Sequence, residues 1–190
     1  MRNQSQMSVR EMNAQNMNES FMDQITSCQD EKSVLTGFTN LDRILHRGLH
    51  PNLIIIGGGT GTGKSSFILQ IADNIAESGR DVLFFSLEMS VSELCAKSIS
   101  RITYAQDPEN ALTAAEIIYD YSIWEKKPDL LMNFNEAKEL YFKKICPHIT
   151  IYEAFLFMTM EKIREEIQKH INTYGKTPVV IIDYIQLLRG

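Results

Sequence analysis

A glycine-rich run in the first third of the chain combines the residue types and the spacing that phosphate binding requires. It covers residues 57–66 and contains the pattern Gly58-x4-Gly63-Lys64-Ser65. The glycines at 58, 59, 61 and 63 allow positive φ and let the backbone approach phosphate oxygens without an intervening Cβ. The lysine supplies a mobile charge for β- and γ-phosphates, and the serine hydroxyl is the expected Mg²⁺ ligand. The candidate phosphate-binding residues are Gly58, Gly59, Thr60, Gly61, Thr62, Gly63, Lys64, Ser65 and Ser66.

The segments on either side of this loop are predicted to position it. Residues 53–56 are four consecutive apolar residues, typical of a buried strand. The apolar residues of 67–76 recur at helical spacing, and Gly79 is placed to end that helix. A strand, a glycine loop and a helix in this order form a nest of backbone N–H groups at the positive end of a helix dipole. We therefore expect a nucleotide-binding P-loop; the alternative is a glycine-rich turn that holds no ligand.

Two acidic residues follow apolar strands and are the candidates to complete the site. Asp183 ends the apolar run that begins at Pro178, and Glu88 follows the apolar run at 82–87. Ligands of open α/β sheets bind at the carboxyl ends of the strands, so both acids are expected at the same edge as the P-loop. Asp183 is expected to hold Mg²⁺ opposite Ser65, and Glu88 to orient or deprotonate the water that attacks the γ-phosphate. The alternative for each is an ordinary acid in the turn after a strand.

Strands and helices alternate along the chain. Strands are predicted at 81–87, 149–152 and 178–183 in addition to 53–56, and helices at 36–45 and 160–171. Because the strands are uniformly apolar, the pattern predicts an α/β fold with a mostly parallel sheet that helices cover on both faces.

The middle of the chain is predicted to be helical. Ser90 and Glu93 have the spacing of a capping box that opens one helix, and Thr113 is a second candidate cap. Over residues 104–147 we further expect Pro128 to interrupt the helical pattern and Asn135 to start another helix.

Composition limits the class of protein. The chain has 190 residues, which suits one α/β domain, and its net charge of −5 argues against a generally basic nucleic-acid binder. Its three cysteines and four histidines show no metal-binding spacing and are expected to be ordinary core or surface residues. There is no secretory signal and no apolar run long enough to cross a bilayer, so we expect a soluble, cytoplasmic protein without membrane partners. Residues 1–32 are expected to form a flexible tail or a linker helix that docks on a partner.

Four ordered motifs resemble the motor domain of DnaB-type replicative DNA helicases, a RecA-like ATPase. They are the run at 36–43, the P-loop, the run at 85–89 around Glu88, and the run at 181–187 around Asp183. The likeness covers residues 33–190. It implies that Lys64 and Ser65 serve the phosphates and Mg²⁺, that Glu88 is the catalytic glutamate, and that Asp183 is the Walker B aspartate. It further implies ATP as the nucleotide, single-stranded DNA as a partner, a homo-oligomeric, hexameric ring, and contact with a helicase loader or primase.

The resemblance also has departures. The chain as given ends at Gly190, just after the Walker B strand, so we expect it to lack the later strands, the DNA-contacting loops and the arginine finger of such motors. We expect either a fragment of a longer protein or a derivative impaired in hydrolysis. Two alternatives to the helicase motor remain open here. One is a recombination ATPase of the RecA or RadA kind, and the other is a truncated, non-hydrolysing nucleotide-binding subunit that regulates a helicase ring.

Overall fold

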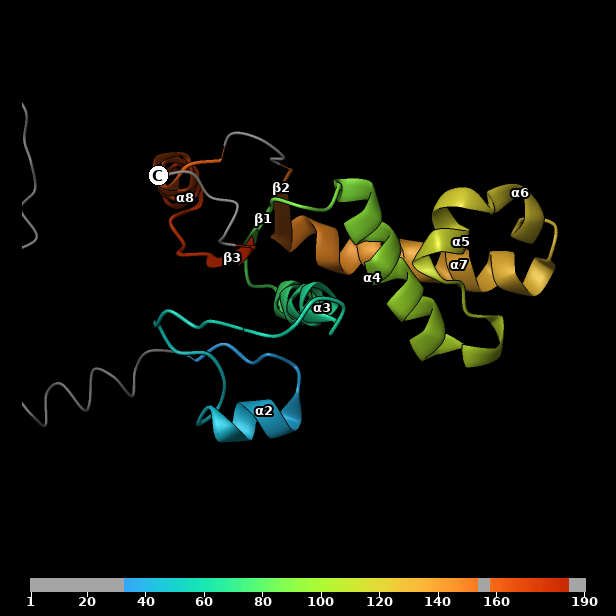
Figure 1. Ribbon diagram of the computed structural model, residues 1–190, viewed down its shortest axis with the longest axis horizontal. Coiled ribbons are helices and arrows are strands. Elements are labelled where there is room, and N and C mark those ends of the chain that lie inside the picture. Colours follow the sequence, from blue (N-terminus) through green and yellow to red (C-terminus); the bar gives the residue numbers. More distant parts are fainter. Residues whose placement is uncertain (1–32, 154–157, 185–190) are drawn as a thin grey trace, which may run out of the picture.

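A three-stranded parallel sheet forms the centre of the protein. The computed structural model describes residues 33–153 and 158–184. Its strands are β1 (Val82–Ser86), β2 (Ile149–Glu153) and β3 (Val179–Asp183), in the order β2-β1-β3 (Figure 1). β1 pairs in parallel with both neighbours, so that its residue Ser86 lies opposite Glu153 on one side and Asp183 on the other. The predicted parallel sheet is therefore confirmed, and three of the four predicted strands are present.

Helices cover both faces of this sheet, as the sequence predicts. Val82 and Phe84 of β1 are buried in the larger core, under α3 (Lys64–Glu77). Leu83 and Phe85 point to the opposite face, where they pack with Ile163 of α8 (Met160–Tyr174). Figure 1 shows α3 and α8 on opposite sides of the strands. The alternation follows from the strand period of two, and every residue of β1 is buried because both faces are covered.

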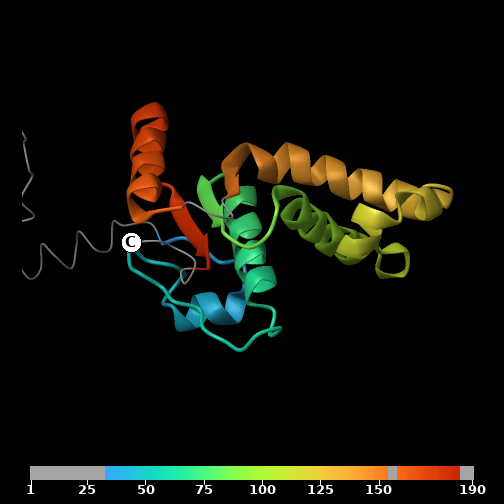
Figure 2. The ribbon, with the colours of Figure 1, turned by 45° about the horizontal axis from the view of Figure 1, so that its top comes forward.

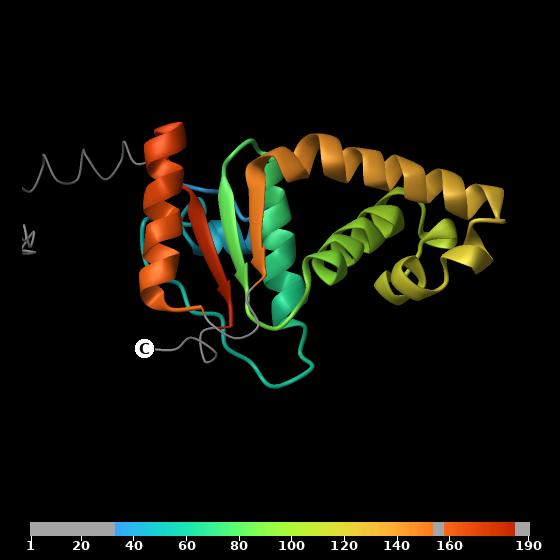
Figure 3. The same ribbon diagram turned by 90° about the horizontal axis from the view of Figure 1, so that it is seen from above.

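A helical extension leads from the sheet and returns to it. It consists of α4 (Val91–Gln106), a 3₁₀ turn at Pro108–Asn110, α5 (Ala114–Tyr119), α6 (Tyr121–Trp124) and α7 (Pro128–Leu140). A π-helical turn at Tyr141–Ile145 and a 3₁₀ turn at Cys146–His148 then lead into β2. Figure 3 shows α4 and α7 running side by side away from the strands.

Both predicted capping boxes are present, but the prediction for the second half of the extension was wrong. Ser90 and Glu93 exchange both capping hydrogen bonds, and Thr113 does the same with Glu116. Pro128 does not interrupt a helix but is the first residue of α7, and Asn135 lies inside that helix. A proline is well tolerated at this position, because the N–H that it lacks has no intrahelical acceptor there. Trp124 is a packing residue as expected, since it is 3% exposed and its Nε1 donates to the Glu116 carbonyl.

The predicted strand at 53–56 is not formed. Leu53, Ile54, Ile55 and Ile56 are 83%, 45%, 77% and 37% exposed, and within the described ranges no strand pairs with them. An apolar tetrapeptide becomes a strand only when a neighbouring strand accepts its backbone hydrogen bonds. Composition therefore predicted the type of element correctly for three segments and incorrectly for this one, for which the described residues supply no partner strand.

A short helix, α2 (Thr39–Ile44), precedes the P-loop, and the ring of its N-cap residue Phe38 packs on Phe67 of α3. It matches the helix predicted at 36–45, but no side chain caps its N-terminus. The buried Asp42 carboxylate instead accepts hydrogen bonds from the Thr36 backbone N–H and hydroxyl, each at 2.8 Å. Asn74 of α3 donates to the Thr36 carbonyl at 2.8 Å, and a Cβ on Gly37 would lie only 2.2 Å from its side-chain nitrogen. These contacts fasten the segment before the P-loop to the helix after it. The expected tail at 1–32 lies outside the described residues.

Candidate nucleotide-binding site

The P-loop leads directly into α3, whose N-terminus is free to bind an anion. Gly61 and Gly63 have positive φ, of 76° and 87°, as expected. Gly58 and Gly59 do not have positive φ, which differs from the expectation. α3 begins at Lys64 with no side-chain cap and no acidic residue in its first turn. By contrast, Ser90, Thr113 and Thr159 cap α4, α5 and α8. The first N–H groups of a helix lack intrahelical acceptors, so this uncapped end retains donors and a positive dipole for phosphate oxygens.

Lys64 folds back over the loop that it follows. Its Nζ donates to the carbonyl oxygens of Gly58 at 2.9 Å and Gly59 at 2.6 Å. The Thr62 hydroxyl donates to the same Gly59 carbonyl at 2.8 Å. The ammonium group thus lies over the loop, and a phosphate bound there would offer it a charged acceptor in place of two neutral ones. Ser65 is half-buried in the first turn of α3, and Thr60 and Ser66 are exposed.

Asp183 ends β3 at the carboxyl edge of the sheet. The residue is 3% exposed, and its Oδ2 has no hydrogen-bond partner among the described residues. Its backbone carbonyl accepts the Leu87 N–H at 2.8 Å, which joins the end of β3 to the chain leaving β1. A buried carboxylate oxygen without a partner is costly, and a cation is the partner that suits its charge. The residues present therefore fit a divalent cation bound next to Asp183.

Glu88 lies in the short connection between β1 and α4. Its side chain is exposed and makes no hydrogen bond or ion pair within the described part of the chain. The backbone around it is held more firmly, because the Ser86 hydroxyl donates to the Met89 carbonyl at 2.6 Å and accepts the Met89 N–H at 3.2 Å. The candidate catalytic carboxylate therefore projects from a tethered turn.

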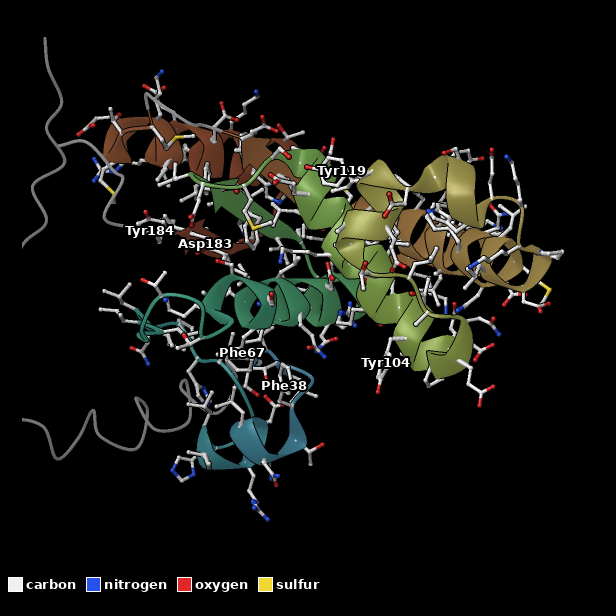
Figure 4. All side chains as sticks on the ribbon, turned by 45° about the vertical axis from the view of Figure 1, so that its right-hand side comes forward. Phe38, Phe67, Tyr104, Tyr119, Asp183 and Tyr184 are labelled. Atoms are coloured by element: carbon white, nitrogen blue, oxygen red, sulfur yellow. The ribbon has the colours of Figure 1, made fainter. Side chains whose placement is uncertain are left out.

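The structure brings the predicted site residues to one edge of the sheet. Figures 2 and 3 show the P-loop, in teal, at the end of the molecule to which the arrowheads of the strands point. Figure 4 labels Asp183 at that end, near the start of α3. Among the described residues, no hydrogen bond or ion pair joins Lys64 or Ser65 to Glu88 or Asp183.

The sequence analysis did not identify an ion pair that joins α3, the helix after the P-loop, to α4. Asp73 of α3 has a fully buried side chain, and its Oδ2 accepts from the Arg101 guanidinium of α4 at 2.9 Å. Burial raises the pKa of Asp73, against the opposing effects of Ser98 and Arg101. The signal in the sequence was an aspartate inside an otherwise apolar helical stretch, between residues 71–72 and 75–76. This contact fixes α3 against α4, and so fixes the P-loop helix against the helix that follows Glu88.

Two histidines lie at the opposite edge of the sheet, and two cysteines pack against the larger core. His148 Nδ1 and His170 Nε2 lie 3.1 Å and 3.3 Å from the two oxygens of Asp81, which directly precedes β1 at the opposite edge of the sheet. Cys95 and Cys146 are free thiols that pack against the larger core, and the Cys95 sulfur lies 3.6 Å from the Tyr141 hydroxyl. Within residues 33–153 and 158–184, no cluster of three His, Cys, Asp or Glu side chains could hold a metal ion.

No helix in the same two ranges is both long enough and apolar enough to cross a membrane.

Comparison with known proteins agrees with this geometry. Residues 33–190 match the family model of the DnaB-like helicase C-terminal domain. The replicative DNA helicase DnaB of Helicobacter pylori is 27% identical over 177 residues, which cover 90% of this chain and 33% of that protein. DnaB of Geobacillus stearothermophilus is 40% identical over 156 residues, covering 82% of this chain and 31% of the relative. The chain thus spans about a third of the length of these relatives.

A solved structure confirms the fold independently. A DnaB-like replicative helicase, described together with its interactions with primase, superimposes with a TM-score of 0.72 at 22% identity. The match covers 95% of this chain and 40% of the other. The parallel sheet flanked by helices is therefore the fold of DnaB-like helicase ATPase domains. With the family model matching all of residues 33–190, the chain belongs to the DnaB-like helicase C-terminal domain family.

Proposed function

We propose that this chain is the nucleotide-binding part of a replicative DNA helicase motor, which hydrolyses ATP while acting on single-stranded DNA. One observation carries the proposal: an uncapped helix N-terminus behind a P-loop lies at the same sheet edge as a buried aspartate, one oxygen of which has no partner among the described residues. The first feature suits phosphate and the second suits a cation, so together they suit a nucleotide bound with Mg²⁺. Family membership supports ATP as that nucleotide.

Each part of the P-loop then has a distinct role. The backbone N–H groups from Gly58 to Ser65 surround the phosphates, with Gly61 and Gly63 providing the positive φ that turns them inward. The Lys64 ammonium gives up its hydrogen bonds to the two loop carbonyls and donates to β- and γ-phosphate oxygens instead. Gly59, Thr60 and Thr62 lie within this run, and Ser66 directly follows it.

Ser65 and Asp183 would hold the Mg²⁺ ion, directly or through water. When bound, the ion neutralises phosphate charge. Glu88 orients the attacking water and accepts its proton as the water oxygen bonds to the γ-phosphorus and the bond to ADP breaks. An exposed carboxylate suits this role, since it must reach a water rather than a protein group.

Assembly is part of the proposal. The relatives are replicative helicases, and a solved neighbour is described with primase, so we propose a homo-oligomeric, hexameric ring in the full protein and contact with a primase or loader. Arginine fingers from a neighbouring subunit accelerate phosphoryl transfer by several orders of magnitude. Turnover by this chain is therefore expected to be slow without partner segments.

The test is ATP binding and hydrolysis by the 190-residue chain, with and without single-stranded DNA. Glu88→Gln serves as the blank for hydrolysis, and Lys64→Ala serves as the blank for binding. We expect ATP binding that Lys64→Ala weakens, and turnover above the Glu88→Gln blank that rises with DNA. Binding without turnover would favour the regulatory subunit over the motor. No binding at all would refute the proposal.

Asp183→Asn tests the metal site separately. The amide keeps the size of the side chain but removes the charge that would face the cation. We expect ATP binding to need more Mg²⁺ in this variant, whereas binding without Mg²⁺ should be unchanged. A magnesium titration that matches the wild type would remove Asp183 from the metal site.

A further inference from the structure

The turn that carries Glu88 is fastened to all three strands of the sheet. Its first residue, Leu87, donates to the Asp183 carbonyl at the end of β3. Met89 is tied through both backbone groups to the Ser86 hydroxyl at the end of β1. The third tie comes from β2, where the Glu153 carboxylate accepts the Val91 N–H at 2.8 Å. Glu153 is 62 residues away from Val91 in the chain, and it is the last residue of its strand.

From these contacts, we infer that Glu153 is a positioning residue that holds the turn bearing Glu88 in place for ATP hydrolysis. The inference rests on the proposed function, because it assigns Glu153 a part in the same reaction. Glu153 does not touch the nucleotide in this account; it acts through the backbone at the start of α4.

Glu88 depends on its backbone for its position. Its side chain has no hydrogen bond or ion pair within the described ranges, so nothing but the turn determines where the carboxylate points. A displacement of about 1 Å in a catalytic group can reduce the rate by about 100-fold. The ties at Leu87, Met89 and Val91 are the contacts that prevent such a displacement.

Among these ties, the one from Glu153 fixes the far end of the turn. The capping box between Ser90 and Glu93 is local and would move together with α4. The hydrogen bond from Val91 to Glu153 instead joins the N-terminus of α4 to the sheet. A negative charge is also favourable there, because it lies at the positive end of the α4 dipole. Loss of Glu153 would remove the hydrogen bond between β2 and the start of α4, and would leave the hydrogen bonds of Leu87 and Met89 to the ends of β3 and β1.

A second feature supports a specific role for the carboxylate. The register places Glu153, Ser86 and Asp183 side by side across the carboxyl ends of the three strands. Two of these residues already hold the turn at Leu87 and Met89. Glu153 completes the row, so each strand end holds a different residue of the connection between β1 and α4.

The experiment compares Glu153→Ala and Glu153→Gln in the full 190-residue chain, with Glu165→Ala as the matched control. Glu165 of α8 is also an exposed glutamate, and it makes no hydrogen bond or ion pair within residues 33–153 and 158–184. Two quantities are measured: kcat and KM for ATP, and amide hydrogen exchange in the peptide covering residues 87–95.

We expect Glu153→Ala to lower kcat by about tenfold with KM for ATP unchanged, because the turn shifts while the P-loop does not. Exchange in the 87–95 peptide should become faster in the same variant. Glu153→Gln keeps an oxygen acceptor for the Val91 N–H, so it should restore most of both properties. Glu165→Ala should match the wild type in both.

Amide hydrogen exchange and ATP turnover distinguish a failure of the proposed function from a failure of the positioning role of Glu153. If the wild type does not exceed the Glu88→Gln blank, the proposed function fails, while faster exchange in Glu153→Ala would still support Glu153 as the anchor of this turn. Unchanged exchange in Glu153→Ala would overturn the anchor whatever the activity. Faster exchange with unchanged kcat in an active protein would overturn the positioning role.

Discussion

Two connections from an apolar segment to a helix meet at the carboxyl edge of the sheet, and they are built very differently. In the first, residues 53–56 lead through the P-loop into α3; in the second, β1 leads through the Glu88 turn into α4. β1 is buried along its whole length and pairs on both sides. Residues 53–56 are exposed and unpaired among the described strands. The Glu88 turn is tied to three strands, whereas the P-loop is closed chiefly by its own Lys64 and Thr62.

The two connections hold their site residues in place in different ways. The P-loop derives its shape from glycines and from the start of a helix, both local properties that need no neighbour. The Glu88 turn derives its shape from contacts with distant residues, such as the Asp183 carbonyl, which lies 96 positions after its donor Leu87. We therefore expect substitutions in the first connection to act mainly on binding, and substitutions in the second to act mainly on turnover and stability.

The largest expected effect is on turnover. Glu88→Gln removes the base but keeps the fold, so we expect hydrolysis to fall by about 10²–10⁴-fold with the Kd for ATP unchanged. Lys64→Ala should instead weaken ATP binding first. Measuring Kd and kcat for both variants checks the separation between the two connections. Normal hydrolysis by Glu88→Gln would show that another residue positions the water.

The next largest effect is expected on the free energy of unfolding, where substitutions in β1 and in residues 53–56 can be compared directly. Phe84→Ala removes a fully buried ring from β1 and should lower the free energy of unfolding by about 3–5 kcal/mol. Ile55→Ala removes a side chain that is 77% exposed and should change it by less than about 0.5 kcal/mol. Denaturant unfolding of both variants measures the contrast. A loss above about 1 kcal/mol for Ile55→Ala would show that residues 53–56 are buried in solution.

A smaller effect is expected at the helix that follows Glu88. Ser90→Ala removes the hydroxyl that accepts the Glu93 N–H in the capping box and should lower the free energy of unfolding by about 1 kcal/mol. Ser92→Ala serves as the control, because it changes an exposed serine two residues further along the chain. Thermal unfolding of the two variants is the measurement. Equal midpoints for both would mean that the cap does not stabilise α4.

The smallest effect concerns the opposite edge of the sheet. Partial burial acts to raise the pKa of Asp81, but the hydrogen bond with His148 and the charges of His170 and Lys176 outweigh it and hold the pKa below its usual range. A depressed folded-state pKa stabilises the protein above the unfolded value of about 3.9, and that stability is lost as pH falls through the folded value.

Asp81→Asn should therefore lower the free energy of unfolding by about 0.2–1 kcal/mol near neutral pH, as is typical of ion pairs near a surface. The difference from the wild type should shrink as the pH falls below about 4. Unfolding midpoints of both proteins between neutral and acidic pH test this. A difference that grows on acidification would mean that Asp81 is not stabilised as a carboxylate.

Much of the site could be predicted because its signals are local. The P-loop spacing, the capping boxes at Ser90 and Thr113, and the acids that end apolar strands each depend on a few neighbouring residues. The start of α7 is also encoded locally, since Pro128 is well placed as a first helical residue. The prediction that Pro128 interrupts the helical pattern was nevertheless wrong. Glu153 and Asp73 could not be assigned in this way, because their partners lie 62 and 28 residues away.

Local sequence decided which segments become helices and strands, and which residues could meet phosphate and magnesium. Helical spacing, glycine conformations and caps act within one or two turns of chain, so they can be recognised without a fold. Tertiary structure decided whether residues 53–56 would find a strand to pair with, how Asp183 came to be buried beside the Glu88 turn, and which carboxylate would hold the start of α4. These outcomes depend on pairings between distant segments, because a backbone hydrogen bond or a buried charge is stable only when its partner is brought into place.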